Sequence, residues 1–441
     1  MPVTPAVYQQ RRQRLLDGLG DGLLVLPTAP EQIRNGDVHQ PFRAGSDFHY
    51  LTGFAEPEAM LVAWRVGKGR HRAVLFVRPR DKEREIWDGR RAGVAGAKKR
   101  CGVDEARPIA QVFPDLPDLL AGHARVFCTL GVDGEFDRRL FAAFARHAAQ
   151  HRRTHPPAHP ILQDPLPAIA AQRLRKDAHE IDALARAGEV TSAGHAAAMR
   201  FARPGCSERE VQAEVEATFR RLGSPREGYS SIVASGANAC ILHYVGNSQP
   251  LRDGELLLID AGCEVDSYAA DITRTFPVSG KFSPAQRDVY ELVLAAQRAA
   301  IAQIAPGQPW DAPHEAAVRV LAQGMLDLKL LTGSLDGVIE SGAYRRFYMH
   351  RTGHWLGLDV HDAGEYKVGG QWRPLVPGMT LTVEPGCYIR AAEDVPRGLW
   401  DIGIRIEDNA LVTADGCEIL TEAAPKSIVE IEALMREPDG A

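Results

Sequence analysis

Residues 256–278 read LLLIDAGCEVDSYAADITRTFPV, and this stretch decides how the rest of the chain is interpreted. Two apolar, β-branched runs at 256–259 and 272–278 flank a middle rich in turn-forming residues, a pattern that predicts an antiparallel hairpin or two paired strands. Each run has an aspartate at its inner end, Asp260 and Asp271. A buried carboxylate is costly unless it is paired or bound to a cation. The two aspartates therefore predict a cation site, although turn-capping aspartates would give the same pattern.

Three downstream stretches carry further candidate ligands. Residues 350–362 read HRTGHWLGLDVHD and hold three histidines, and residues 380–388 read TLTVEPGCY, an apolar strand that ends in a glutamate before proline. Residues 402–408 read IGIRIED, an alternating strand that places its arginine and its glutamate on one face. The candidate metal ligands are the carboxylates of Asp260, Asp271, Glu384 and Glu407 and one of the histidines His350, His354 and His361.

This set of residue types suits two divalent cations. Four carboxylates and one imidazole are oxygen-rich ligands that favour Mn²⁺, Co²⁺ or Zn²⁺ over a thiolate-loving ion. Two ions about 3.5–4 Å apart need bridging carboxylates, and a hydroxide held between them would be nucleophilic near neutral pH. The expected reaction class is metal-assisted hydrolysis.

Other catalytic motifs are absent from the sequence. His314 and Glu315 lack the second histidine of H-E-x-x-H, and no G-x-S-x-G or G-x-x-x-x-G-K-[ST] motif occurs. A net charge of −5 gives no electrostatic case for nucleic acid or for an anionic membrane. No run approaches the ~18 apolar residues of a membrane span. Seven cysteines without a C-x-x-C pair, and no signal-peptide pattern, indicate a reduced, cytoplasmic protein.

Composition divides the chain near residue 170. Prolines crowd residues 155–167, which indicates a linker because proline interrupts helices and central strands. A helical pattern follows at 174–200, and Ser207-x-x-Glu210 and Ser283-x-x-Gln286 are capping boxes that predict two more helix starts. We therefore expect a mixed α/β domain over residues 1–170 and an α+β domain over residues 171–441.

The sequence resembles the pita-bread dinuclear metallopeptidases, and among them most closely the aminopeptidase P branch. SDFHYLTGF (46–54) and EIWDGRR (85–91) resemble the N-terminal domain of that branch. The segments ILHY (241–244), IDAGCE, DITRTFPV, GHWLGLDVHD, VEPG and GIRIED resemble its catalytic domain, whereas residues 351–353 depart from the family pattern. The resemblance implies a creatinase-like N-terminal domain followed by a pita-bread catalytic domain with a curved antiparallel sheet.

The resemblance also implies a ligand set and a metal. One ion is expected on Asp271, His354, Glu384 and Glu407, and the other on Asp260, Asp271 and Glu407. Asp271 and Glu407 would then bridge two ions, for which the family prefers Mn²⁺, with Co²⁺ or Zn²⁺ as alternatives.

Further roles are implied for residues around the ligands. Glu384 is expected to relay a proton from the bridging water to the leaving proline nitrogen, and His361 to stabilise the tetrahedral intermediate. His243 and His350 are expected to line the pocket for the penultimate proline. Arg405 is expected to hold the carboxylate of a metal ligand, that of Asp260.

The implied activity is release of the N-terminal residue from peptides with proline at the second position, by attack of a metal-bridging hydroxide. The family often forms dimers or tetramers, and Trp87 would then contact a neighbouring subunit; a Trp half-buried under its own loop is the alternative. The rival activity is that of a prolidase, which takes only Xaa-Pro dipeptides. A catalytically inactive binding module would lack ligands, and none is missing here.

Overall fold

The computed structural model describes residues 3–151 and 160–437 and divides into two compact units, Met1–Arg173 and Leu174–Ala441. Each unit is described by itself. No helix in the described ranges is both long enough and apolar enough to cross a membrane.

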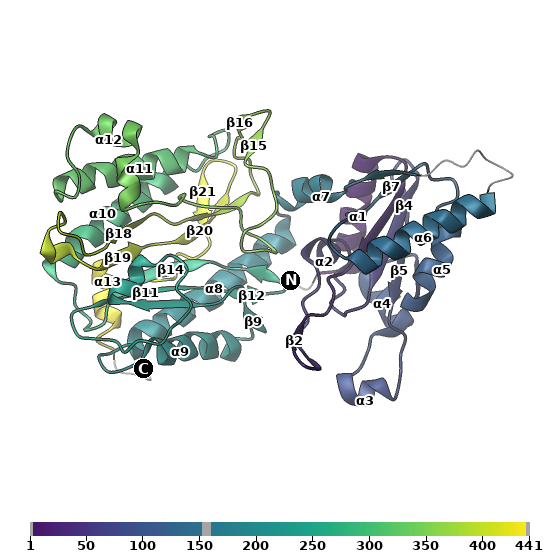
Figure 1. Ribbon diagram of the computed structural model, residues 1–441, viewed down its shortest axis with the longest axis horizontal. Helices are drawn as coiled ribbons and strands as arrows, with labels where there is room; N and C mark the ends of the chain where they lie inside the picture. Colours follow the sequence, from purple (N-terminus) through teal and green to yellow (C-terminus); the bar gives the residue numbers. More distant parts are fainter. Residues whose placement is uncertain (1–2, 152–159, 438–441) are drawn as a thin grey trace. The chain divides into compact units, whose positions relative to one another are not determined.

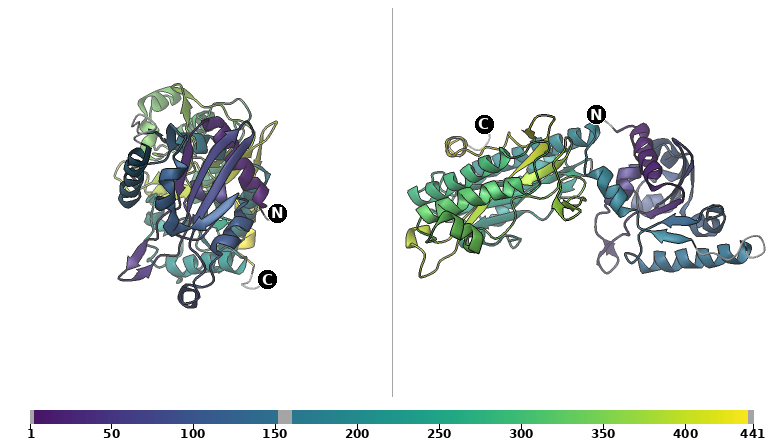
Figure 2. Two further views of the ribbon diagram at one scale, coloured as in Figure 1. Left: turned by 90° about the vertical axis from the view of Figure 1, so that its right-hand side faces the viewer. Right: turned by 90° about the horizontal axis from the view of Figure 1, so that it is seen from above.

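A six-stranded mixed sheet forms the centre of the first unit (Figure 1; Figure 2). Its strand order is β6-β5-β4-β1-β7-β8, with antiparallel pairing of β4 to β1 and to β5 and parallel pairing elsewhere. Alternate residues of β1 face opposite sides, and Leu23 and Val25 join a core with side chains of α5 and α6. The strands are β1 Leu23–Pro27, β4 Met60–Gly67, β5 Arg70–Val77, β6 Glu105–Pro108, β7 Arg125–Phe127 and β8 Ile161–Gln163.

Seven helices and a short hairpin complete the described part of this unit. The helices are α1 Pro5–Leu19, α2 Ser46–Thr52, α3 Arg84–Asp88, α4 Gly93–Cys101, α5 Val112–Leu119, α6 Gly134–His151 and α7 Leu166–Arg173, and the hairpin pairs β2 Ile33–Asn35 with β3 Val38–His39.

The predicted proline-rich linker is only partly a linker. Residues 155–159 lie outside the described residues, but Ile161–Gln163 pairs with β7 at the edge of the sheet and Leu166–Arg173 is helical. The prediction is therefore wrong for residues 161–163 and 166–167, whereas residues 164–165 lie in neither a strand nor a helix. Pro160 precedes the strand and Pro167 lies in the first turn of α7, two positions at which proline disrupts no intrahelical or ladder hydrogen bond.

The predicted strand pair is confirmed and organises the second unit. β11 (Leu256–Ala261) pairs antiparallel with β14 (Ile272–Pro277) along its whole length, with Asp260 opposite Thr273. On its other side β11 pairs with β10 (Ile232–Ser235). The turn-forming middle holds two short strands, β12 (Cys263–Val265) and β13 (Tyr268–Ala269), and β12 also pairs with β9 (Arg226–Glu227).

Further short strands carry the C-terminal candidate ligands. β17 (Thr380–Val383) pairs with β20 (Asp408–Val412), and β18 (Gly386–Ile389) pairs with β19 (Ile402–Arg405). The predicted strand over 402–408 breaks after Arg405, so Glu407 lies between β19 and β20. The remaining pairs are β20 with β21 (Cys417–Ile419) and β15 (Lys367–Val368) with β16 (Gln371–Trp372).

The strands of the second unit lie between two groups of helices, α8 and α9 on one side and α10 and α11 on the other (Figure 1). Both predicted capping boxes are confirmed, by Ser207 with Glu210 and by Ser283 with Gln286. The helices are α8 Ala178–Phe201, α9 Glu208–Arg221, α10 Pro284–Ile301, α11 Ala312–Asp327, α12 Leu335–Ser341 and α13 Ile428–Leu434.

Helix α8 begins later than its sequence pattern predicts. The pattern starts at Leu174, but the side chain of Asp177 accepts hydrogen bonds from the backbone N–H groups of His179 and Glu180 and so caps the helix. The residue whose side chain accepts these hydrogen bonds is the N-cap, and the helix begins at the residue after it. Residues 174–176 therefore precede the helix.

Candidate metal centre

All five predicted ligands come together in the second unit. Asp260 lies on β11, Asp271 directly precedes β14, Glu384 directly follows β17, and Glu407 lies between β19 and β20. His354 is in the loop before β17, where its backbone N–H donates to Thr382 Oγ1 at 3.0 Å. The ends of paired strands thus bring together carboxylates that are far apart in the sequence.

Distances among these side chains suit cation binding. His354 Nε2 lies 3.4 Å from Asp271 Oδ2 and 3.6 Å from Glu384 Oε1. One ligand atom each of Asp271, His354 and Glu407 can be chosen so that all three lie within 4.8 Å of one another. Asp271 and Glu407 are 5% and 2% exposed, so water contributes little to their solvation.

The protonation of these groups shows that negative charge is in excess. Burial raises the pKa of Glu384 to about 7. Burial also raises the pKa values of Asp271 and Glu407, and the neighbouring carboxylates add to the rise. Burial opposes the charged form of His354, but the hydrogen bond to Asp271 and the charges of Glu384 and Asp271 raise its pKa to about 9. Bound cations would supply the positive charge that protons supply otherwise.

A tyrosine hydroxyl shows the same excess of acceptors. Tyr229 Oη lies 2.6 Å from Asp260 Oδ1 and 2.5 Å from Asp271 Oδ1. A hydroxyl has one proton and can donate to only one carboxylate at a time. Tyr229 can therefore satisfy only one of the two aspartates at a time, and the other carboxylate receives no proton from it.

Arg405 connects three parts of the site. Its guanidinium donates to Asp260 Oδ2 at 2.6 Å, to Tyr388 Oη at 3.0 Å and to Thr273 Oγ1 at 3.0 Å. Thr273 in turn donates to Glu407 Oε2 at 2.6 Å. One buried cation thereby orients two of the predicted ligand carboxylates, which is the arrangement that holds metal ligands in place.

The ring nitrogens of His350 both face protein groups. Nδ1 lies 2.8 Å from the carbonyl oxygen of Arg351 and Nε2 lies 2.8 Å from Tyr388 Oη. Burial lowers the pKa of His350 to about 3, so the ring is neutral. A carbonyl only accepts, so Nδ1 carries the proton and Tyr388 donates to Nε2. His350 is therefore left with its ring face and its carbon edge for contact with a substrate.

His361 and His243 are both exposed. The ring of His361 lies edge-on to that of His354, with 4.3 Å between centroids. Burial lowers the pKa of His361, and the charge of His354 lowers it further, so the neutral ring can donate one N–H. His243 follows the 3-10 turn Gly236–Cys240, and its place beside His350 and His361 stays a prediction.

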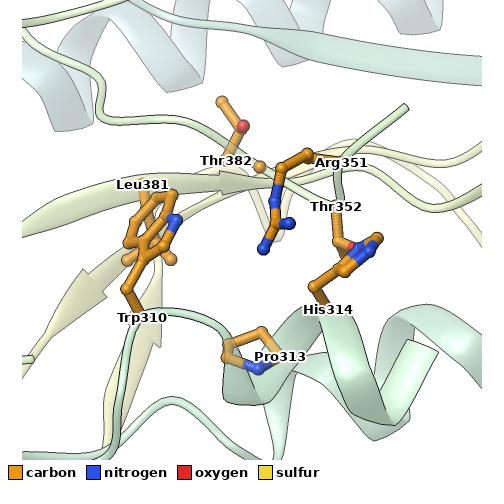
Figure 3. A pocket seen from close by; sticks show the side chains of 8 residues that line it. Trp310, Pro313, His314, Arg351, Thr352, Leu381 and Thr382 are labelled. Atoms are coloured by element: carbon orange, nitrogen blue, oxygen red, sulfur yellow. The ribbon is translucent and has the colours of Figure 1, made fainter. Parts of the chain in front are cut away.

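A small pocket adjoins the loop that carries these histidines, and Figure 3 shows Arg351 pointing into it between Trp310 and His314. Arg351 pairs with Asp311, and its guanidinium carbon lies 4.9 Å from the centroid of the Trp372 ring. The residues that depart from the family pattern thus line this pocket.

Trp87 lies on α3 of the first unit and is 84% exposed. The alternative in which its ring is half-buried under its own loop is therefore wrong. The other interpretation, in which Trp87 contacts a neighbouring subunit, stays a prediction.

The sequence interpretation missed Tyr229, Thr273 and Tyr388. Thr273 had a signal, because residues two apart on a strand share a face and Asp271 is a predicted ligand. The sequence around Tyr229 contains no signal that would mark this residue as part of the site. Its position follows from the register of β10 against β11, in which Ile232 lies opposite Asp260.

The fold and this site define a class: a two-unit chain with a carboxylate- and imidazole-lined centre of the kind that dinuclear metallohydrolases use. The model of metallopeptidase family M24 matches residues 182–414, and that of the aminopeptidase P N-terminal domain matches residues 8–127. The chain belongs to metallopeptidase family M24.

Relatives cover almost the whole chain. The Xaa-Pro aminopeptidase of Haemophilus influenzae is 43% identical over 97% of this chain and 96% of its own length, and that of Escherichia coli is 42% identical over 97% of each. Among solved structures, a Pseudomonas aeruginosa aminopeptidase has a TM-score of 0.95 and 48% identity over 98% of each chain. Escherichia coli aminopeptidase P with the inhibitor Pro-Leu has a TM-score of 0.95 and 41% identity over 99% of each. The fold is therefore that of an aminopeptidase P-type domain followed by a pita-bread domain.

The raised carboxyl pKa values predict that the stabilising effect of metal grows with pH. Between pH 4.5 and about 7 the folded, metal-free chain keeps a proton on Glu384 that the unfolded chain has lost, so its stability falls as pH rises through this window. The raised pKa of His354 extends the fall to about pH 9. Bound cations replace these protons and remove the fall.

We expect the metal-induced rise in melting temperature, measured by differential scanning fluorimetry, to be several degrees larger at about pH 8 than at about pH 5. The stripped and loaded proteins are compared in the same buffers, which cancels titration of the rest of the chain. An equal rise at both pH values would contradict the charge balance described for this site.

Proposed function

We propose that the chain is a metal-dependent Xaa-Pro aminopeptidase that hydrolyses the bond preceding a penultimate proline. The observation that carries this function is the cluster in which Asp260 lies beside three carboxylates, Asp271, Glu384 and Glu407, whose pKa values are raised, and the imidazole of His354, whose pKa is raised as well. Its relatives over nearly the whole chain are Xaa-Pro aminopeptidases, and an Escherichia coli relative is described with the inhibitor Pro-Leu.

The donor set fits two divalent ions. Asp271, His354, Glu384 and Glu407 would hold one ion, and Asp260 with the bridging Asp271 and Glu407 would hold the other. The oxygen-rich set favours Mn²⁺, with Co²⁺ or Zn²⁺ as alternatives. When bound, such ions lower the pKa of a coordinated water and polarise the carbonyl of the scissile bond.

The chain's own residues then move protons and orient the peptide. Glu384, with a pKa raised to about 7, can accept a proton near neutral pH and pass it to the proline nitrogen. His361 donates an N–H to the substrate as negative charge develops on the carbonyl oxygen. Arg405 keeps Asp260 in place through its 2.6 Å hydrogen bond.

Selection of proline rests on what that residue lacks. The nitrogen of an Xaa-Pro bond carries no N–H, so a selective site offers ring contacts in place of an acceptor. His350 has both nitrogens occupied by protein groups and presents ring carbons, and His243 is the second histidine that we infer for this pocket. Together they would form the wall against which the pyrrolidine ring packs.

We further infer that the chain works in the cytoplasm as a dimer or tetramer. Trp87 and Ile86 are 84% and 80% exposed on α3. Adjacent exposed apolar side chains are typical of an interface between subunits.

The test compares two tripeptides on metal-loaded protein. We expect Ala-Pro-Ala to release alanine and Ala-Ala-Ala to remain nearly untouched, because the second peptide lacks the ring and leaves its N–H without an acceptor. The dipeptide Ala-Pro separates the rival activity, since a prolidase would cleave it and reject the tripeptide. Equal rates on the two tripeptides would contradict proline selection.

A further inference from the structure

A buried ion pair lies directly beside the candidate active site. Lys176 Nζ is 2.8 Å from Asp362 Oδ2, and both side chains are only 1% exposed. Asp362 is the residue after His361. Burying two charges has a large desolvation cost, so such a pair at this position calls for an explanation beyond general stability.

The carboxylate of Asp362 closes the loop that carries His361. Its Oδ1 accepts a hydrogen bond from the backbone N–H of Asp359 at 3.3 Å, and its own N–H donates to the carbonyl of Trp355 at 2.9 Å. A Cβ on Gly357 would lie 2.2 Å from Asp362 Oδ2, so only glycine leaves room for the carboxylate there. The loop is thus wrapped around this side chain.

The cation comes from a distant and well-anchored part of the chain. Lys176 is 186 residues away from Asp362 in the sequence. Its backbone N–H donates to the carbonyl of Gly378 at 2.8 Å, and the next residue, Asp177, caps α8. Lys176 therefore stands at a rigid junction immediately before a long helix.

His361 itself has little packing to hold it. Its side chain is exposed, in contrast to the fully enclosed pair beside it. Placement of the imidazole 4.3 Å from the His354 ring therefore depends on the backbone of its loop. The ion pair links that loop to the residues before α8, in addition to the backbone hydrogen bonds from Ala269 to Gly357 and from Leu356 to Thr380.

We propose that Lys176 is a positioning residue for His361, acting through Asp362. The inference rests on the role proposed above for His361 in catalysis. The ion pair holds the loop so that the imidazole N–H meets the substrate oxygen, and it takes no part in the chemistry. A pair that served stability alone would affect unfolding without a specific effect on turnover.

The first experiment replaces Lys176 by Met in the metal-loaded, full-length protein. We expect kcat on Ala-Pro-Ala to fall about 10- to 100-fold, the range produced by small misplacements of a catalytic group, with KM and metal content nearly unchanged. Lys176→Arg keeps the charge and should recover part of kcat. The matched control is Arg12→Met, which removes a fully buried cation from the first unit and should leave kcat unchanged.

Removal of Lys176 alone leaves a buried carboxylate without its cation, which can prevent folding. The paired variant Lys176→Met/Asp362→Asn removes both charges and keeps the test valid. We expect it to fold, to bind metal and to show the same loss of kcat. A paired variant with normal turnover would overturn the proposal.

A double-mutant cycle with His361→Ala shows whether the effect passes through this histidine. We expect His361→Ala to lower kcat by about 10²–10³-fold, as for loss of one oxyanion donor. Lys176→Met should then have less than about a threefold further effect, because nothing is left to position. Equal effects of Lys176→Met in both backgrounds would overturn the positioning role while leaving that of His361 intact. Unchanged kcat in His361→Ala alone would overturn both.

Discussion

Replacement of Asp271 by Asn, or of Glu407 by Gln, is expected to abolish nearly all hydrolysis of Ala-Pro-Ala. Each change keeps the shape of the side chain and removes a negative charge that would be shared between two cations. Loss of an outer partner of a metal ligand typically lowers affinity or activity about 10- to 100-fold, so loss of a bridging charge should exceed about 100-fold.

The variants should also lose at least one ion per chain while keeping the fold. Elemental analysis measures the metal content, and circular dichroism reports the fold. Asp253→Asn provides a matched control because that aspartate lies in an exposed turn before β11 and is not a predicted ligand. Two ions per chain in both ligand variants would contradict the assignment of Asp271 and Glu407 as bridging ligands.

Removal of metal should have a comparably large effect. A chelator is expected to lower turnover of Ala-Pro-Ala by more than about 100-fold, because cations supply several kcal/mol of transition-state stabilisation and each 1.36 kcal/mol is tenfold in rate. Addition of Mn²⁺ or Co²⁺ to the stripped protein should restore the rate. The control is Mg²⁺, whose preference for water and near-ideal octahedral geometry suits an imidazole-containing site poorly.

Local signals account for the parts of the fold that the sequence predicted well. The β11–β14 pair follows from two apolar runs around a turn, and the starts of α9 and α10 follow from capping boxes within four residues. In these cases the interactions that determine the structure join residues close in the sequence. A short segment of the sequence is therefore enough to predict them.

The errors arose where a distant partner or a single residue decided the outcome. The helical pattern in the sequence begins at Leu174, but α8 begins at Ala178, directly after its cap at Asp177. The predicted start was therefore four residues early. Ile161–Gln163 resembled a linker because its pairing partner, β7, lies more than 30 residues upstream. The break after Arg405 has no apolar or turn signal, because pairing with different neighbours ends β19 and begins β20.

The candidate site shows the same division. The strand-end carboxylates stand out because charge is unusual after a buried apolar run. No such signal marks Tyr229, Lys176 or Asp362, because the partner of each lies far away in the sequence. Tyr229 contacts Asp260 and Asp271, and Lys176 contacts Asp362. Only the folded arrangement brings these side chains together near the candidate site.

The most direct test of the dinuclear centre is a titration of metal-free protein with Mn²⁺ while the release of alanine from Ala-Pro-Ala is followed. A dinuclear centre predicts almost no release without metal and a rate that rises until two ions are bound per chain, with Ala-Ala-Ala remaining uncleaved throughout. Full activity in exhaustively stripped protein, or a rate that is complete at one ion per chain, would contradict a dinuclear centre built on Asp271 and Glu407.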